Sequence, residues 1–239
     1  MEARAALITG GSSGIGLTIA RALGEDGYRL TVAARRPEKL DSAAEQLRGQ
    51  GFDVEAVPAN IAEEEAIRSL VERHRARFGR LDVLVNNAGV GIGGPIAEAK
   101  TKKLDIQLDV NLRAVYLATR ECLPMLNEAG GRHGKALVVN MASIAGKFGQ
   151  GWLAAYSATK FGVVGLTQAL HKEHAADGIQ ATALCPGFVN TAMTDWLEGV
   201  AKEEMIQPED IAEAVRYLLR TSRACIVPEI QFIRAGDAM

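Results

Sequence analysis

Tyr156 and Lys160 stand four residues apart in a segment, 155–176, whose apolar residues recur at helical spacing. On a helix their side chains would share one face, which brings a phenol next to an ammonium group. A tyrosine phenol has an ordinary pKa of about 10, and a neighbouring cation lowers this pKa by stabilising the phenolate. The pair could therefore exchange a proton near neutral pH, as general acid–base catalysis requires. The alternative is an ordinary surface pair, and the rest of the chain must decide between the two.

A glycine-rich turn near the N-terminus is the second feature that could do chemistry. The apolar run 5–8 predicts a strand buried on both faces, and helical spacing begins at Leu17. Between them lies the segment 9–16, which reads Thr-Gly-Gly-Ser-Ser-Gly-Ile-Gly. Between a strand and a helix, glycines let the backbone approach a pyrophosphate, whose charge then lies at the helix N-terminus. We therefore expect a dinucleotide site, the alternative being a plain turn.

The residues that follow the next two strands indicate which dinucleotide would bind. Arg35 and Arg36 follow the predicted strand 28–34, where an acidic residue would bind the ribose 2′-hydroxyl of NAD. An arginine at this place accommodates the 2′-phosphate of NADP, so the sequence favours NADP(H) over NAD(H). Both arginines could instead be solvated loop residues. Asn60 lies just past the third strand, 52–57, within reach of an adenine ring.

Strands alternate with helices along the whole chain, which predicts the fold. Such alternation is typical of an α/β protein with a doubly wound parallel sheet and right-handed crossovers. We expect about seven strands with helices on both faces, the Rossmann fold, in a single NAD(P)-binding domain over 1–239. Further strands are predicted at 81–85, 135–140, 180–184 and within 225–234, and further helices at 62–78 and 100–128. Ligands of such sheets bind beyond the carboxyl ends of the strands.

Two helices carry residues that are unusual for a helix interior. Asn111 lies between Val110 and Leu112 within the predicted helix 100–128, which favours a buried polar role over the usual solvent exposure. Helix 155–176 carries the small residues Ala158, Gly162, Gly165 and Ala169. Each interior glycine costs about 1 kcal/mol relative to alanine, so close approach of another element is expected. We predict that both helices pack against a second copy of the chain, in a dimer or tetramer.

Composition and charge exclude several other kinds of protein. The 239 residues have a formal net charge of −2, which gives no general attraction to nucleic acid. No apolar run reaches the ~18 residues that a membrane span needs, and no apolar leader precedes the first strand. We therefore expect a cytoplasmic protein without a nucleic-acid or membrane partner. Cys122, Cys185 and Cys225 are odd in number and widely spaced, typical of reduced thiols.

Two clusters of basic residues are interpreted as structural. The run 73–77 contains three arginines and His74, and we expect it to form the solvated last turn of helix 62–78, which Gly79 ends. His171 and His174 lack the surrounding pattern of a zinc site. We therefore expect no metal ligands in this chain.

Taken together, these motifs resemble the short-chain dehydrogenase/reductase family, in its short single-domain branch, over nearly the whole chain. The resemblance is carried by Thr9-Gly10 with Gly14-Ile15-Gly16, by Asn86-Asn87-Ala88-Gly89, by Tyr156 with Lys160, and by Pro186-Gly187. It implies four catalytic residues: Asn111, Ser143, Tyr156 and Lys160. With the arginines above, the expected cofactor contacts are Gly10, Ser12, Ser13, Gly14, Ile15, Gly16, Arg35, Arg36, Asn60, Ile61, Asn87, Ala88, Gly89, Tyr156, Lys160, Pro186, Gly187, Val189 and Thr191.

The resemblance also implies a role for each catalytic residue. Tyr156 would exchange a proton with the substrate oxygen, and Ser143 would hydrogen-bond the same oxygen. Lys160 would lower the pKa of Tyr156 and bind the nicotinamide ribose, while the backbone of Asn111 would hold a water next to Lys160. The chain departs from the family in two places. Asn60 replaces the usual aspartate, which keeps an acceptor for the adenine, and the C-terminal segment lacks the common Asp-Gly-Gly element.

The function that this set predicts is an NADP(H)-dependent oxidoreductase that transfers hydride between a nicotinamide and a carbonyl or secondary alcohol. The alternatives are a non-catalytic NADP-binding regulator or scaffold, and an epimerase or dehydratase. We expect a small-molecule substrate to be selected by segments 90–95, 144–152 and 188–207. No arginine or lysine there is placed to bind a substrate carboxylate, and Met193 and Trp196 indicate an apolar pocket unless they belong to the core.

Overall fold

The structure is a computed structural model that describes residues 3–236, and its centre is one sheet of seven parallel strands. In spatial order the strands are β3 (Val54–Pro58), β2 (Arg29–Ala34), β1 (Ala5–Thr9), β4 (Val83–Asn86), β5 (Ala136–Met141), β6 (Ile179–Pro186) and β7 (Glu229–Phe232). Chain order runs in opposite directions on the two sides of the β1–β4 pair. This is the switch point at which doubly wound sheets bind ligands.

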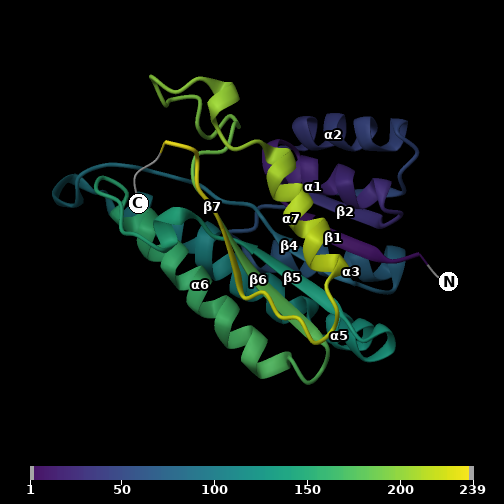
Figure 1. Ribbon diagram of the computed structural model, residues 1–239. Coiled ribbons are helices and arrows are strands. Elements are labelled where there is room, and N and C mark those ends of the chain that lie inside the picture. Colours follow the sequence, from purple (N-terminus) through teal and green to yellow (C-terminus); the bar gives the residue numbers. More distant parts are fainter. Residues whose placement is uncertain (1–2, 237–239) are drawn as a thin grey trace.

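Helices cover both faces of the sheet (Figure 1). One face carries α1 (Gly14–Glu25), α2 (Pro37–Gly49) and α7 (Pro208–Arg220), and the other carries α3 (Glu64–Phe78), α5 (Ala114–His133) and α6 (Ala154–His174). Each face has its own apolar core, because the strands are apolar on both sides; β1, for example, is buried along its whole length. The predicted doubly wound α/β sheet is therefore confirmed.

The predicted helix 100–128 is divided into three parts. It consists of α4 (Thr101–Leu108), a π-helical turn η2 (Asp109–Arg113), and α5, which continues to His133. A π-turn inserts one extra residue into a helix and is frequently found at functional sites. Asn111 lies in this turn with its side chain fully buried, so the expectation of a buried polar role is confirmed.

The basic run in α3 differs in one residue from its expected solvated state. Gly79 ends the helix with a φ of +68°, as predicted. His74, however, is fully buried, with Nδ1 2.7 Å from the Thr31 hydroxyl and Nε2 2.9 Å from the Arg80 carbonyl. Burial lowers the pKa of His74 to about 4, so the ring is neutral at pH 7.

The remaining expectations about composition concern thiols, metals and membranes. All three cysteines are free thiols, and Cys122 and Cys185 are buried. Residues 3–236 contain no group of histidine, cysteine or carboxylate side chains that could hold a metal ion. Within the same residues, none of the helices combines the length and the apolar character needed to cross a bilayer.

Candidate active site

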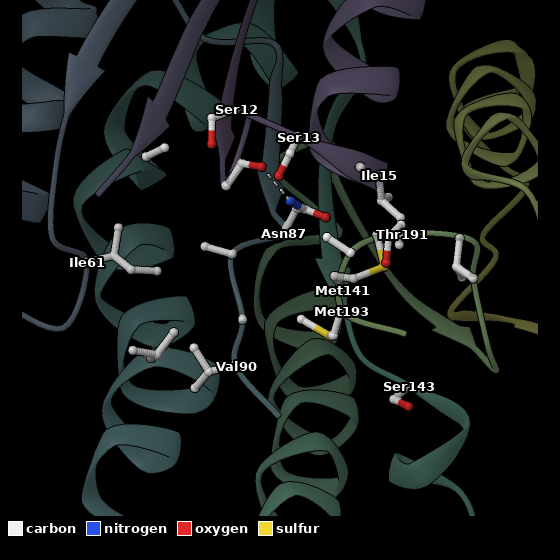
Figure 2. Close-up of a pocket in the computed structure, with 18 of the residues that line it drawn as sticks. Ser12, Ser13, Ile15, Ile61, Asn87, Val90, Met141, Ser143, Thr191 and Met193 are labelled. Atoms are coloured by element: carbon white, nitrogen blue, oxygen red, sulfur yellow. Dashed lines mark hydrogen bonds between the residues drawn. The ribbon is translucent and has the colours of Figure 1, made fainter. Parts of the chain in front are cut away.

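A cavity of about 330 Å³ opens at the carboxyl ends of the strands, across the switch point between β1 and β4. Figure 2 shows Ser12, Ser13 and Ile15 at one end, Ser143 at the other, and Met193 between them. The cavity is lined by every expected site residue except Gly16 and Asn111. It is also lined by residues that the sequence reading did not assign to the cofactor, namely Ala33, Ala34, Ala59, Val90, Val110, Met141, Ala142, Ala192, Met193 and Thr194. Several of these residues end or directly follow strands. Their position at the carboxyl end of a predicted strand is the signal by which the sequence could have identified them.

The glycine turn forms the first end of the cavity. Gly10 and Gly14 have φ values of +67° and +53°, which glycine adopts without strain. A Cβ on Gly10 would lie 2.7 Å from the Asn87 amide nitrogen, and one on Gly16 would lie 2.4 Å from the Gly10 carbonyl oxygen. Gly16 therefore packs behind the turn instead of lining the cavity. Ser13 precedes α1 without a side-chain capping bond, which leaves the first-turn N–H groups available to an anion.

Asn87 ties this turn to the neighbouring strand β4. Its Nδ2 donates to the carbonyl oxygens of Thr9 (3.0 Å) and Gly10 (3.2 Å), and the hydroxyl of Thr9 accepts from the backbone N–H of Asn87 (3.1 Å). The two strand ends at the switch point are thereby held together. Asn86, one residue earlier, turns instead into the core, where its Nδ2 donates to Asn140 Oδ1 (2.9 Å).

The expected adenosine end is formed by Arg35, Arg36 and Asn60. Both arginines line the cavity and are exposed, and within residues 3–236 neither guanidinium forms an ion pair with a carboxylate. Two unpaired cations at this place suit a phosphate better than a neutral hydroxyl. Asn60 donates from Nδ2 to the Glu63 carboxylate at 2.7 Å, so its Oδ1 is the atom left to accept a hydrogen bond.

The opposite end of the cavity contains Tyr156, Lys160 and Ser143. Tyr156 and Lys160 share one face of α6, as predicted, with the ammonium nitrogen 5.5 Å from the centroid of the tyrosine ring. Lys160 is buried and donates to the Met141 carbonyl at 2.7 Å. Ser143 follows β5, and its hydroxyl accepts from the backbone N–H of Ala145 (3.1 Å), which fixes the turn that begins there.

Burial dominates the proton equilibria of these groups. It raises the pKa of the Tyr156 phenol above its ordinary value of 10, against the opposing effect of a hydrogen bond with Ser143. It also lowers the pKa of Lys160 to about 8. The expected lowering of the Tyr156 pKa by Lys160 is therefore wrong for this structure. The ammonium group lies beside the ring and donates to a carbonyl, so it compensates little of the desolvation of the phenolate.

Asn111 does not line the cavity but positions a loop that does. Its Oδ1 accepts from the backbone N–H of Val90 (2.8 Å), and its Nδ2 donates to the Val90 carbonyl (2.8 Å) and to the Thr159 hydroxyl (3.2 Å). The side chain thus joins the loop after β4 to α6. The sequence pattern could indicate that Asn111 is buried, but it could not indicate this partner.

Of the large apolar residues in the predicted substrate segments, Met193 lines the cavity, Trp196 follows it by three residues, and Trp152 lies between the lining residues Ser143 and Tyr156 in the sequence. We call the border formed by segments 144–152 and 188–207 the mouth of the cavity. Met193 and Trp196 are 50% and 56% exposed, so the alternative that they belong to the core is wrong. Trp152, at the end of segment 144–152, is 57% exposed. Large apolar side chains that remain this open beside a cavity are typical of a ligand-binding surface.

The chain matches the family model described as short chain dehydrogenase over residues 4–199. It is 34% identical over 247 residues to the 3-oxoacyl-(acyl-carrier-protein) reductase FabG of Staphylococcus aureus, with 99% of this chain and 98% of that protein covered. Its fold superposes on an alcohol dehydrogenase of the archaeon Thermococcus sibiricus complexed with 5-hydroxy-NADP, with a TM-score of 0.90, 30% identity, and 100% and 99% of the two chains covered.

A third similar protein was crystallised with the other nicotinamide dinucleotide. It is the 3-ketoacyl-(acyl-carrier-protein) reductase of Brucella melitensis complexed with NADH, at 29% identity and a TM-score of 0.88, with 96% of this chain and 97% of that chain covered. The similar proteins therefore support a nicotinamide cofactor and leave the choice between NADP and NAD to the residues of this chain.

Proposed function

Because this chain belongs to the short-chain dehydrogenase/reductase family, we propose that it is an NADP(H)-dependent oxidoreductase that interconverts a carbonyl compound and a secondary alcohol. One observation carries the proposal. Tyr156 and the buried Lys160 lie with Ser143 at one end of a cavity whose other end is a glycine turn at a helix N-terminus. A protein that only binds a dinucleotide needs the turn but not the three proton-handling side chains.

The residues of the cavity fit a nicotinamide dinucleotide. The uncapped N-terminus of α1 and the close-packed Gly10 suit a pyrophosphate, because no side chain stands between the backbone N–H groups and the ligand. Arg35 and Arg36 would hold the 2′-phosphate of NADP, and Asn60 would accept from the adenine amino group. A nicotinamide bound at the Tyr156 end supplies or accepts the hydride at the substrate carbon.

Tyr156 would donate its proton to the substrate oxygen during reduction and take it back during oxidation. The raised pKa of the phenol keeps this proton in place at neutral pH, which suits the donor role. Ser143 would donate a hydrogen bond to the same oxygen and so fix the carbonyl before reaction. Positioned donors of this kind stabilise the negative charge that develops on the oxygen.

Lys160 would act on the charge that Tyr156 leaves behind. A phenolate formed next to a buried ammonium is better compensated than one formed in a purely apolar site. Its lowered pKa, about 8, also lets Lys160 pass a proton on without reaching strongly alkaline pH. Asn111, through the π-turn in which it lies, would hold the water next to Lys160.

The decisive experiment is an NADPH oxidation assay with a panel of ketones and aldehydes, run beside a fluorescence titration with NADPH and NADH. The proposal expects substrate-dependent oxidation of NADPH and tighter binding of NADPH than of NADH. Replacement of Arg35 by alanine should reduce that preference about tenfold, since one charge-assisted contact is lost. Tight binding of NADPH without turnover on any carbonyl would support the non-catalytic regulator instead.

Self-association is also part of the proposal. Leu104, Leu108, Tyr116 and Phe161 on α4, α5 and α6 are each 38% to 55% exposed, and an interface with a second copy of the chain would cover them. Gly165 is open, whereas Gly162 is explained within the chain, because a Cβ there would lie 3.0 Å from Leu112. A monomer in light scattering at micromolar concentration would contradict the proposed dimer or tetramer.

A further inference from the structure

Trp152 has a backbone conformation that its side chain does not favour. It is the one non-glycine residue with a positive φ, +67°, among residues 3–236. The backbone N–H of Leu153 donates to the Gln150 carbonyl (3.2 Å), which makes Trp152 the third residue of a β-turn. At this position a turn with positive φ normally has glycine, because a Cβ is strained there. Strain of this kind is typical of functional sites and persists only where the surrounding structure holds the residue in place.

The indole ring is held by a glycine that faces it. A Cβ on Gly93 would lie 2.0 Å from Cζ3 of Trp152, so the ring lies directly on the Gly93 backbone. The Gly94 N–H donates to the Trp152 carbonyl at 2.8 Å, which joins the two segments a second time. Two residues before Gly93, Gly91 lies against the Tyr156 ring, where a Cβ would be 3.9 Å from Cδ2. The loop after β4 therefore connects the proposed acid directly to Trp152.

Trp152 also contacts the segment on the other side of the mouth. Its ring centroid lies 6.3 Å from that of Trp196, at an interplanar angle of 51°, and Phe188 packs edge-on against Trp196 at the same centroid distance. The base of this segment is fixed, because Val189 and Ile206 form a parallel bridge. Both indoles nevertheless remain more than half exposed. The pair thus presents flat aromatic surface to the solvent from the two segments that form the mouth.

We propose that Trp152 and Trp196 form an aromatic platform that binds the planar, uncharged ring of an aryl ketone while its carbonyl reaches Tyr156. This rests on the proposed function and assigns its substrate class. Aromatic rings prefer offset or edge-to-face contact with another planar ring, which a saturated ring of the same size cannot reproduce. The lysines of the two mouth segments form ion pairs, Lys147 with Glu229 (2.8 Å) and Lys202 with Asp195 (2.9 Å). A carboxylate on the substrate ring would therefore gain no cationic partner.

The test compares acetophenone with cyclohexyl methyl ketone, which differ in the planarity of the ring. The ratio of their kcat/KM values is measured in the wild type and in Trp152→Ala, Trp196→Ala and Trp152→Phe, so that intrinsic reactivity cancels. We expect the ratio to fall about fivefold in each alanine variant, mainly through KM for acetophenone, and to be largely kept in Trp152→Phe. Tyr217→Ala, a half-exposed aromatic residue on α7, is the matched control and should leave the ratio unchanged.

A second measurement does not depend on catalysis. Trp152 and Trp196 are the only tryptophans in the 239 residues, so intrinsic tryptophan fluorescence reports on the platform alone. Ethylbenzene, which has no carbonyl, should change this fluorescence saturably, and ethylcyclohexane should do so far more weakly. The same titration of Trp152→Ala should lose the difference between the two probes.

The outcomes separate this inference from the proposed function. A saturable ethylbenzene response in a protein that reduces no ketone would support the platform and overturn the oxidoreductase proposal. If both alanine variants reduced ketones with an unchanged ratio of kcat/KM for acetophenone to that for cyclohexyl methyl ketone, the platform would be overturned and the proposed reductase activity would stand. Equal fluorescence responses to the two hydrocarbons would also overturn the platform, because the surface would then bind apolar molecules regardless of whether their ring is planar.

Discussion

The glycine turn and the mouth of the cavity are built in opposite ways. At the glycine turn, positive φ values belong to Gly10 and Gly14, and the absence of side chains creates the space. At the mouth, a positive φ belongs to Trp152, and large exposed side chains create the surface. The first end obeys local backbone rules that apply to any phosphate-binding turn. The second end violates such a rule, and the violation costs stability that tertiary contacts must offset.

This difference indicates how the work is divided. The glycine end and the Tyr156 end provide a reaction that is independent of substrate identity, and the mouth decides which molecule is admitted. Changes at the first two ends should therefore abolish cofactor binding or turnover, whereas changes at the mouth should alter selectivity and leave the chemistry intact. Substitutions at the glycine turn, at the Tyr156 end and at the mouth test this division.

The largest effect is expected from Tyr156→Phe, which removes a single oxygen atom. We expect kcat to fall by about 10²- to 10⁴-fold, the usual contribution of a positioned general acid. NADPH affinity should remain within about threefold of the wild type, because the ring and its packing are kept. Stopped-flow reduction and a fluorescence titration measure the two quantities. A kcat within about tenfold of the wild type would remove Tyr156 from the mechanism.

The sequence predicts the glycine end and the Tyr156 end well because both depend on local relations. The turn 9–16 follows a buried strand and opens a helix, and Tyr156 and Lys160 are one helical turn apart. A parallel, doubly wound sheet follows from the alternation of strands and helices, and it brings Ser143, which follows β5, to the same edge. Residues distant in sequence thus meet through rules of topology rather than through specific side-chain contacts.

Features that depend on tertiary burial could not be read in the same way. The spacing of Tyr156 and Lys160 suggested a lowered phenol pKa, but only the structure shows that Lys160 donates to Met141 and that burial dominates. The π-turn at Asn111 could be predicted only if the hydrogen bond between Asn111 and Val90 were already known. Trp152 at a glycine position of a turn carries no sequence signal, because its contacts with Gly93 and Trp196 join segments that are distant in the sequence.

A second prediction tests the close packing of the glycine turn. Alanine normally stabilises a helix relative to glycine by about 1 kcal/mol, so Gly16→Ala in α1 would be favourable by propensity alone. Its Cβ would instead meet the Gly10 carbonyl oxygen at 2.4 Å and force the turn open. We expect a lower melting temperature and at least about tenfold weaker NADPH binding.

The control for this substitution is Gly151→Ala, because a Cβ at Gly151 meets no atom within 4 Å. It should leave both the melting temperature and NADPH binding close to the wild type. If Gly16→Ala behaved like Gly151→Ala, the glycine turn would be looser than the structure indicates. The contrast between the glycine turn and the mouth would then be lost.

A third prediction concerns the cost of burying Lys160. Its folded-state pKa, about 8, lies below the ordinary value of 10.5, so the unfolded chain binds more protons between these values. Below pH 8 the buried charge therefore destabilises the fold, and this penalty disappears as the pH rises from 8 to 10.5. Lys160→Met should inactivate the enzyme yet raise the free energy of unfolding at pH 7. The expected rise is about 1–2 kcal/mol, because the loss of the hydrogen bond to Met141 offsets part of the gain from removing the buried charge.

Urea unfolding of the wild type and Lys160→Met between pH 7 and 10.5 measures this effect. The difference between the two curves should be greatest at pH 7 and shrink with rising pH. Lys172→Met, an exposed position on the same helix, is the control and should show no such trend. A wild type that is more stable than Lys160→Met at pH 7, with no gain in stability up to pH 10.5, would mean that Lys160 stabilises the fold as a cation.

The smallest effect is expected at the mouth, from a comparison of Trp152→Gly with Trp152→Ala. Both variants lose the indole and its contacts with Gly93 and Trp196, so they differ only in how they tolerate a φ of +67°. Glycine adopts this conformation freely, and alanine carries a cost of about 1 kcal/mol. Trp152→Gly should therefore melt a few degrees above Trp152→Ala. Equal melting temperatures would mean that the turn relaxes once the indole is gone. The strain would then be imposed by the packing of Trp152, and the aromatic contacts alone would account for the shape of the mouth.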